Sequence, residues 1–347
     1  MSSSSCELLQ EDSFLQNLPS NIPKYKYEGE TQFCMIMDIE LRRLEKSMIA
    51  QAQQRAAPQE KADRPGIKDD SLLSRHIQRG NRQQNPSRRV TRSFLKSESP
   101  NFISVHQPRD SLGQTDNSPD GELPCDCILF YIPSHSIQSD ILDSSVLSRP
   151  NRYSFDLAAN LLLVKMVTKI HSDIGQFVNM ALIRVITQMG LASSIRFYAG
   201  ATIREEGRGK EGDQGWGPLP VPQGFPDKPT VTLEVGISES QMKLQRDVHW
   251  WLDPAKGDAN TTVTIKVDRK RPRLMIDRWE RIDGVIQITQ QIEISKVNGQ
   301  TELTNDSLTI PFESLFRRQP AGNENDIALD RGTLQELAER TWNSQGF

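Results

Sequence analysis

The sequence predicts an α+β domain with a mixed central sheet flanked by helices, preceded by a long disordered N-terminal arm. Apolar residues are sparse over the first third of the chain, one strongly periodic helix follows near residue 171, and β-branched runs alternate with helical segments after it. We therefore expect a disordered arm at residues 1–124, a folded domain at residues 125–320, and a C-terminal tail with a short helix at residues 321–347.

The disordered arm is predicted from composition. Hydrophobic residues make up 36% of the 347-residue chain and the mean hydropathy is −0.56, whereas globular proteins hold ~45–50% apolar residues. The deficit lies in the arm, which is rich in Ser, Gln, Arg, Asp and Pro and cannot bury enough surface to offset the entropy of ordering.

Two segments of the arm have a pattern of their own. Residues 38–55 suggest a transient solvated helix capped by Asp38, or else a partner-binding helix. Residues 75–96 form a basic stretch, which we interpret as a solvated linker, a phosphate-binding segment or a nuclear address.

The elements of the folded domain follow in order from hydrophobic periodicity. The clearest is a helix opened by His171, with apolar residues on one face at helical spacing and Gly190 at its end. A second helix is expected from Ser238 or Ser240 to Trp251. We expect strands at residues 127–132, 155–166 (a strand pair or a single strand), 194–205, 230–235, 263–269, 274–281 and 285–296, with a turn at residues 207–212.

Two carboxylates in the second half of the domain suit a divalent cation. Asp213 and Glu234 lie at or in short extended segments, and the helix that follows carries Lys243. Mg²⁺ and Mn²⁺ prefer oxygen ligands and keep open positions for water and phosphate. The sequence therefore predicts a metal site at Asp213 and Glu234.

Charge, cysteine content and hydropathy bound the setting of the protein. The net charge is −3, and the four cysteines are too few and too unevenly spaced for a disulfide framework, which fits a reducing compartment. Cys125 and Cys127 could belong to a zinc site, but no His or Cys pair follows at zinc-finger spacing. Since no apolar run reaches about 18 residues and the N-terminus lacks a basic and apolar leader, we expect an intracellular, cytoplasmic or nuclear protein outside the membrane.

The ordered blocks KExD, PTxxLEVGxSES, KLxxDxxWWL and RWE, after a helix with a leading His, carry a resemblance. Together they resemble a group of fungal proteins of unknown function whose core is similar to the Uma2-like branch of the PD-(D/E)XK nuclease superfamily. The resemblance spans residues 161–280. It implies a restriction-endonuclease-like fold, a Mg²⁺ or Mn²⁺ cofactor and a nucleic acid substrate.

Carried over position by position, the resemblance places Asp213 at the first acid of the motif and Glu234 at the second. The usual Lys would lie two residues after the second acid, where this chain has Gly236. The Uma2-like pattern places its Lys on the following helix, which makes Lys243 the matching candidate. An ammonium there would stabilise the negative charge that develops in the transition state. The residue before the first acid is Gly212 where the motif has Pro, which loosens the presentation of Asp213.

Two function classes remain open. The first is a metal-dependent nuclease, or phosphodiesterase, that acts on nucleic acid. The second is a catalytically degenerate nuclease fold that serves as a binding or scaffold module, which Gly236 favours. A nucleotide-cofactor enzyme is not supported, because residues 207–212 match neither a P-loop nor a dinucleotide pattern. The oligomeric state does not follow from the sequence.

Several polar residues near the two acids have a structural and a functional interpretation. His171 is expected to be a helix-boundary residue, with a contact to the metal cluster or a hydrogen bond to a phosphate as the alternatives. Ser238 and Ser240 suit an N-cap, an anion site at the helix N-terminus, or both. Lys210 and Glu211 are expected to form a water-exposed loop pair, with Glu211 as an outer metal ligand as the alternative.

Overall fold

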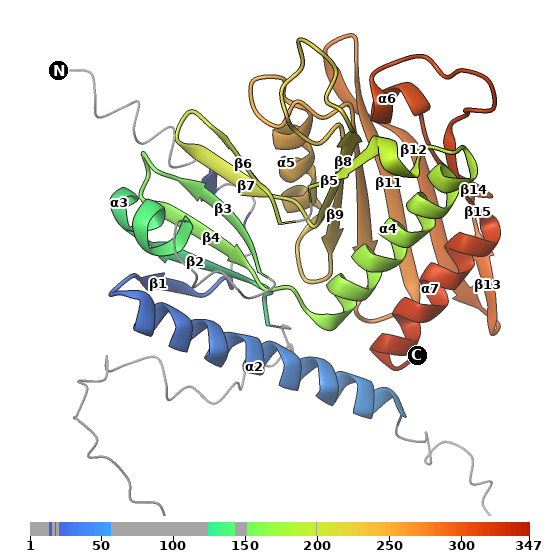
Figure 1. Cartoon of the computed structure of the whole chain (residues 1–347). Helices are drawn as coiled ribbons and strands as arrows, with labels where there is room; N and C mark the ends of the chain where they lie inside the picture. The colour runs from blue at the N-terminus through green and yellow to red at the C-terminus, as the bar shows by residue number, and fades with distance from the viewer. Residues whose placement is uncertain (1–13, 16–17, 19–20, 57–123, 143–150, 199) are drawn as a thin grey trace, which may run out of the picture. The chain divides into compact units, whose positions relative to one another are not determined.

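The computed structural model describes residues 14–15, 18, 21–56, 124–142, 151–198 and 200–347 (Figure 1). These residues form two larger sheets, a two-stranded sheet and several helices, which confirms a mixed α+β protein. The seven-stranded sheet has the order β13-β12-β11-β10-β9-β8-β5, and the six-stranded sheet has the order β1-β2-β4-β3-β7-β6. The strands are β1 (Lys24–Lys26), β2 (Cys127–Tyr131), β3 (Arg152–Asp156), β4 (Leu161–Lys165), β5 (Ile195–Phe197), β6 (Thr202–Glu205), β7 (Arg208–Glu211), β8 (Gln214–Pro218), β9 (Val231–Gly236), β10 (Thr261–Val267), β11 (Arg273–Ile282), β12 (Val285–Val297), β13 (Gln300–Leu303), β14 (Ser307–Ile310) and β15 (Ile327–Asp330). The helices are α2 (Glu30–Ala56), α3 (Ser134–Ser136), α4 (Lys169–Gln188), α5 (Gln241–Leu252), α6 (Phe312–Phe316) and α7 (Arg331–Gln345), with a π-helical turn at Ile137–Leu142 and a 3₁₀ turn at Ala192–Ser194.

The seven-stranded sheet separates an apolar face from a polar one. Helices α4 and α7 lie on the same face in Figure 1, and they pack against Leu233 and Val235 of β9 in the largest core cluster. Because side chains alternate along a strand, Glu234 points to the opposite face, where α5 packs. Strands β9 and β10 are parallel and α5 connects them, so α5 is held against the polar face.

The six-stranded sheet also divides its side chains between two faces. Leu162 and Val164 of β4 pack in a cluster with α2, which runs along this sheet in Figure 1. Leu161 and Leu163 lie in another cluster with Cys125 and Cys127. Lys165 follows in the same alternation, so this buried strand carries a lysine on the face away from α2.

The prediction of disorder was wrong for residues 24–56. β1 pairs in parallel with β2, and α2 begins at Glu30, well before the expected cap at Asp38. Phe33 and Leu44 of α2 are 2% exposed and pack against the six-stranded sheet. Burial against strands about a hundred residues later in the chain offsets the conformational entropy that α2 loses on folding. The composition of residues 24–56 alone therefore did not reveal the helix. Residues 57–123, including the basic stretch, lie outside the described residues.

Phe33→Ala is expected to lower the free energy of unfolding by about 3–5 kcal/mol, because it removes a buried ring that stacks on Phe130 at 4.8 Å between centroids. Ile39→Ala is the matched control on the same helix, since Ile39 is 47% exposed, and it should change stability by less than about 0.5 kcal/mol. Urea unfolding measures both. Equal, small effects of the two substitutions would contradict the packing of α2 described above.

Three further expectations were wrong. Residues 207–212 are not a turn throughout, because residues 208–211 form β7, which pairs with β3 and β6. Residues 194–205 form two strands, β5 and β6, that belong to different sheets. The tail at residues 321–347 is part of the main core, since β15 pairs with β14 and Trp342 of α7 is fully buried. The buried apolar residues of α7 are few, and they pack with α4 in the main core, a contact that the local sequence does not encode.

Other elements match the sequence. Of the two alternatives for residues 155–166, the structure has a strand pair, the antiparallel β3 and β4, although β3 begins earlier, at Arg152. Helix α4 ends before Gly190, whose φ of +79° is the left-handed conformation that a helix C-terminus favours. Helix α5 is confirmed, and its N-cap is Ser240, whose side chain accepts a hydrogen bond from the Lys243 backbone N–H at 3.1 Å.

Candidate active site

Asp213 and Glu234 meet at the ammonium of Lys165. Asp213 directly precedes β8, Glu234 lies in the adjacent β9, and Lys165 ends β4 of the other sheet. The Lys165 Nζ donates to Asp213 Oδ2 and to the Val235 carbonyl, each at 2.7 Å, and lies 3.7 Å from Glu234 Oε2. Asp213 Oδ2 also accepts a hydrogen bond of 2.7 Å from the Val235 backbone N–H. The two predicted acids therefore surround one cation supplied by the protein itself.

A closed ring of alternating charges extends from this point, and we call it the ion-pair ring. Each of its three carboxylates contacts two different lysines, one through each oxygen. In order, the ring runs Lys165, Glu239, Lys243, Asp247, Lys210, Glu234 and back to Lys165, with Asp213 attached at Lys165. The N···O separations are 3.6 Å for Lys165–Glu239, 3.3 Å for Glu239–Lys243, 3.1 Å for Asp247–Lys210 and 3.2 Å for Lys210–Glu234.

Three strands (β4, β7 and β9), the helix α5 and the turn before it supply the ring. Glu239 lies in the turn between β9 and α5, while Lys243 and Asp247 are four residues apart on α5 and so share one helix face. Lys210 comes from β7 of the six-stranded sheet. Trp251 of α5 donates its indole N–H to Glu234 Oε1 at 2.6 Å. The ring thus joins the polar face of one sheet to the other sheet.

Two opposing effects set the pKa values of these groups. Burial favours the neutral form of each group, whereas ion pairs with its neighbours favour the charged form. Burial acts to raise the pKa of Asp213, but the charge of Lys165 outweighs it and lowers that pKa to about 2. Burial acts to lower the pKa of Lys165, yet the carboxylates of Asp213, Glu239 and Glu234 hold it well above its usual value. For Glu234 burial dominates, and the pKa is raised despite Lys210 and Lys165. With Asp213 the site holds four carboxylates against three ammonium groups, and the nearby charges of Asp247 and Asp213 also raise the pKa of Glu234.

The pKa of Asp213 predicts a specific acid sensitivity. Because its folded-state pKa of about 2 lies below the ordinary 3.8, Asp213 contributes stability that is fully present above about pH 4 and is lost as pH falls toward 2. The difference in unfolding free energy between wild type and Asp213→Asn should therefore shrink by about 2 kcal/mol over this interval. Urea unfolding at several pH values measures it. A difference that stays constant between pH 5 and pH 2 would contradict the pairing of Asp213 with Lys165.

The third residue predicted from sequence, Lys243, lies in the ring but its described contacts are with Glu239 and Asp247. Gly236 cannot take a longer side chain without rearrangement, since an added Cβ would lie 2.7 Å from Leu244 Cδ1. The residue that sequence reasoning missed is Lys165. Its signal was a lysine within the otherwise apolar run LLLVKM, at a position where a charge needs a buried partner.

Lys210 and Glu211 do not form a water-exposed loop pair, so that expectation was wrong. They are 5% and 6% exposed and lie on β7. Glu211 accepts hydrogen bonds from the Thr202 hydroxyl at 2.6 Å and from the Tyr153 backbone N–H at 3.3 Å. The alternative role as an outer metal ligand gains no support from these contacts.

His171 lies in the first turn of α4, as expected, but it is 2% exposed and points inward. Its Nε2 lies 3.5 Å from Asp126 Oδ2, and its Nδ1 lies 3.0 Å from the Thr168 hydroxyl. Ser238 donates to the other oxygen of Asp126, so this serine is not the cap of α5. Burial and the nearby charge of Lys165 lower the pKa of His171, which keeps it neutral at pH 7.

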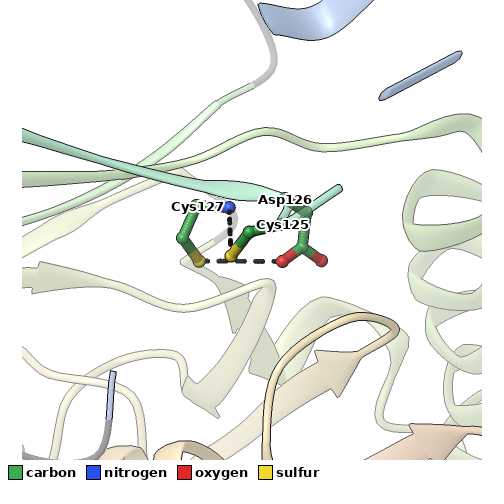
Figure 2. Close-up of side chains that lie close together, drawn as sticks. All are labelled: Cys125, Asp126 and Cys127. Carbon is green, nitrogen blue, oxygen red and sulfur yellow. Dashed lines mark hydrogen bonds between the residues drawn. The ribbon is translucent and has the colours of Figure 1, made fainter. Parts of the chain in front are cut away.

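Among the described residues, the potential ligand atoms of Cys125, Asp126 and Cys127 lie within 4.8 Å of one another and form a group that could hold a metal ion. Figure 2 shows their side chains close together where β2 begins. All three residues are buried.

A pocket of about 450 Å³ opens beside the ring. Lys210 and Asp247 of the ring contribute to its wall, and most of the charged side chains around them are basic. Those basic side chains and one indole are Arg208, Arg246, His249, Lys256, Arg281 and Trp250. Asp213 and Glu234 do not line this pocket and are 5% and 1% exposed.

Comparison with known proteins leaves the family open. No protein-family model matches the chain, and no curated protein matches it. Among solved structures, the chain is similar to one described as a "putative nuclease belonging to DUF820" from Anabaena variabilis ATCC 29413, with 13% sequence identity and a TM-score of 0.33. The alignment covers 54% of this chain and 90% of that one. At this TM-score no argument rests on the likeness, and no site residue is carried over from it.

Among the described residues, no helix is both long and apolar enough to cross a membrane.

Proposed function

We propose that this protein is a metal-dependent phosphodiesterase of the PD-(D/E)XK type that acts on nucleic acid. The observation that carries the proposal is the convergence of Asp213, Glu234 and the Val235 carbonyl on one point, the ammonium of Lys165. The strands that bear the acids are adjacent and antiparallel, and β9, α5 and β10 form a crossover behind them. This arrangement supports a restriction-endonuclease-like core.

The donor set suits a hard divalent cation. Two carboxylates and a backbone carbonyl are the oxygen ligands that Mg²⁺ and Mn²⁺ take, and the Lys165 ammonium stands in for a cation among them. Asp213, Glu234 and the Val235 carbonyl would hold the ion, and Lys165 would move aside. An ion bound there would supply an activated water and polarise a phosphoryl oxygen.

The remaining residues would act on the substrate and on its charge. Lys165, once moved aside, stays next to both acids and can stabilise the negative charge that develops on the phosphoryl group. Lys243 would act indirectly, because its ion pairs hold Glu239 and Asp247 in position beside the lysines that contact Glu234. The basic pocket beside Lys210 and Asp247 would receive the phosphate backbone, with the Trp250 indole as an apolar or stacking contact.

The test is a titration of the full-length protein with Mn²⁺, followed by incubation with single- and double-stranded DNA and RNA. Saturable Mn²⁺ binding and metal-dependent cleavage of at least one substrate are expected, and both should be lost in Asp213→Asn. Absence of both in folded wild-type protein would reject the phosphodiesterase.

A second candidate is a catalytically degenerate nuclease fold that binds nucleic acid or serves as a scaffold. The pairing of both acids with lysines favours it. The position of Leu244 also favours it, because the Cβ of a lysine at position 236 would lie 2.7 Å from Leu244 Cδ1. The same substrates separate the two candidates. Salt-sensitive binding that Arg281→Ala weakens, without Mn²⁺ binding or cleavage, would support the binding module.

A further inference from the structure

A second cluster of potential ligands lies beside the ion-pair ring, and its chemistry differs from that of the proposed Mg²⁺ site. Cys125, Asp126 and Cys127 offer two sulfur atoms and a carboxylate within 4.8 Å of one another (Figure 2). Residue 126 lies in a bend just before β2 begins, so strict alternation of side chains does not separate Asp126 from its two neighbours. We propose that these three residues form a site for a thiophilic, tetrahedral cation such as Zn²⁺.

The separations already suit such an ion. Cys127 Sγ lies 3.7 Å from Asp126 Oδ1 and 3.6 Å from Glu239 Oε1. A tetrahedral Zn²⁺ with Zn–S of about 2.3 Å and Zn–O of about 2.1 Å has S···O edges of about 3.6 Å. Glu239 approaches Cys127 but already pairs with Lys165 and Lys243. The protein therefore supplies three ligands, Cys125, Asp126 and Cys127, and a fourth position of a tetrahedral ion would be left for water or another ligand.

Polar atoms around the cluster make only long contacts. Among the described residues, Asp126 Oδ2 and His171 Nε2 face each other at 3.5 Å, and Glu239 Oε2 lies 3.6 Å from the Lys165 Nζ. None of the three atoms makes a hydrogen bond, although their residues are only 1%, 2% and 1% exposed. Buried polar atoms without hydrogen bonds are rare and costly, so a cation held by Asp126 would compensate charge that these long contacts leave partly unpaired. His171 Nε2, 3.5 Å from Asp126 Oδ2, is placed to hold the carboxylate in position from behind, as histidine and carboxylate pairs do at zinc sites.

Sulfur ligands distinguish this site from the carboxylates around Lys165. Thiolates select Zn²⁺ and similar soft ions, whereas carboxylates and carbonyls select Mg²⁺ and Mn²⁺. When Zn²⁺ binds, each thiol loses its proton to water and forms a Zn–S bond, so two protons are released per ion. The inference does not depend on the proposed phosphodiesterase activity.

The metal needs a route to a buried cluster. Cys125 and Cys127 pack in a hydrophobic cluster with Phe14, Leu15 and Leu18 against them. An ion can therefore load before the chain folds, or when this N-terminal segment moves away. For this reason the experiment includes protein refolded in the presence of the metal.

The test uses Co²⁺, whose spectrum reports tetrahedral geometry and thiolate ligands, on reduced full-length protein under anaerobic conditions. One Co²⁺ per chain is expected, with a sulfur-to-cobalt charge-transfer band, displacement by Zn²⁺, and release of two protons per ion. Cys125→Ser and Cys127→Ser should each weaken binding at least about 100-fold, and His171→Asn about 10- to 100-fold. Cys34→Ser is the matched control, because Cys34 lies on α2 away from the cluster, and it should bind normally.

Circular dichroism verifies that each variant folds, and the charge-transfer band and proton release of the wild type test the site even where a cysteine variant does not fold. Wild-type protein that binds no Co²⁺, native or refolded, would overturn the inference. Binding without the charge-transfer band would also overturn it. If Asp213→Asn abolishes Co²⁺ binding and both cysteine variants retain it, the ion belongs to the carboxylate site, and the inference fails while the proposed function stands.

Discussion

Lys165→Met is expected to lower the free energy of unfolding by about 3–5 kcal/mol at neutral pH. The substitution keeps the volume of the side chain but leaves Asp213, Glu234 and Glu239 without their shared ammonium in a site that is at most 6% exposed. Removing one member of a buried ion pair leaves an uncompensated charge, which costs more than the pair itself contributes. Urea unfolding of the full-length protein measures this loss.

A double substitution tests whether the stability lost in Lys165→Met comes from uncompensated carboxylates. Adding Asp213→Asn to Lys165→Met should recover part of the lost stability, because it removes one of the uncompensated charges. Lys256→Met is the matched surface control, since Lys256 pairs with Asp253 where both side chains are about one third exposed, and it should cost less than about 1 kcal/mol. Similar losses for the two lysine variants would show that the ion-pair ring contributes little.

Asp213→Asn and Glu234→Gln are each expected to reduce Mn²⁺-dependent cleavage of nucleic acid to background. Each change removes a negatively charged oxygen ligand while preserving side-chain size, so saturable Mn²⁺ binding should also be lost. Asp277→Asn is the matched control, because Asp277 is a buried carboxylate of the same sheet that bonds to Gln291 and Gln241 instead of the ring. It should retain both Mn²⁺ binding and cleavage.

Lys243→Met separates charge stabilisation from metal binding. Because Lys243 contacts Glu239 and Asp247, its loss should lower the cleavage rate by less than about 100-fold and leave Mn²⁺ affinity nearly unchanged. A loss as complete as that of Asp213→Asn would show that Lys243 acts directly at the metal. If Asp213→Asn and Glu234→Gln cleave as fast as the wild type, Asp213 and Glu234 are not the metal ligands of the active site.

The sequence by itself determined the elements whose signal is local. The apolar face of α4, the start of α5 at Ser238 or Ser240 and the alternation along β9 each depend on nearby residues, so periodicity and capping chemistry revealed them. The choice of Ser240 as the cap came from the structure. The same local pattern singled out Asp213 and Glu234 as two acids on neighbouring extended segments, and the structure places them at one ammonium.

Tertiary structure alone decided which side chains complete the site and which segments belong to the fold. Lys165 lies 48 residues before Asp213 and comes from the other sheet, and no local pattern encodes that two sheet faces will meet. Helix α2 was misjudged for the same reason, because its low average hydropathy conceals the few residues that pack against β2 and β4. Burial of a charge or of a sparse apolar stripe becomes favourable only when a distant segment supplies the partner. That partner is a property of the assembled sheets and not of the local sequence.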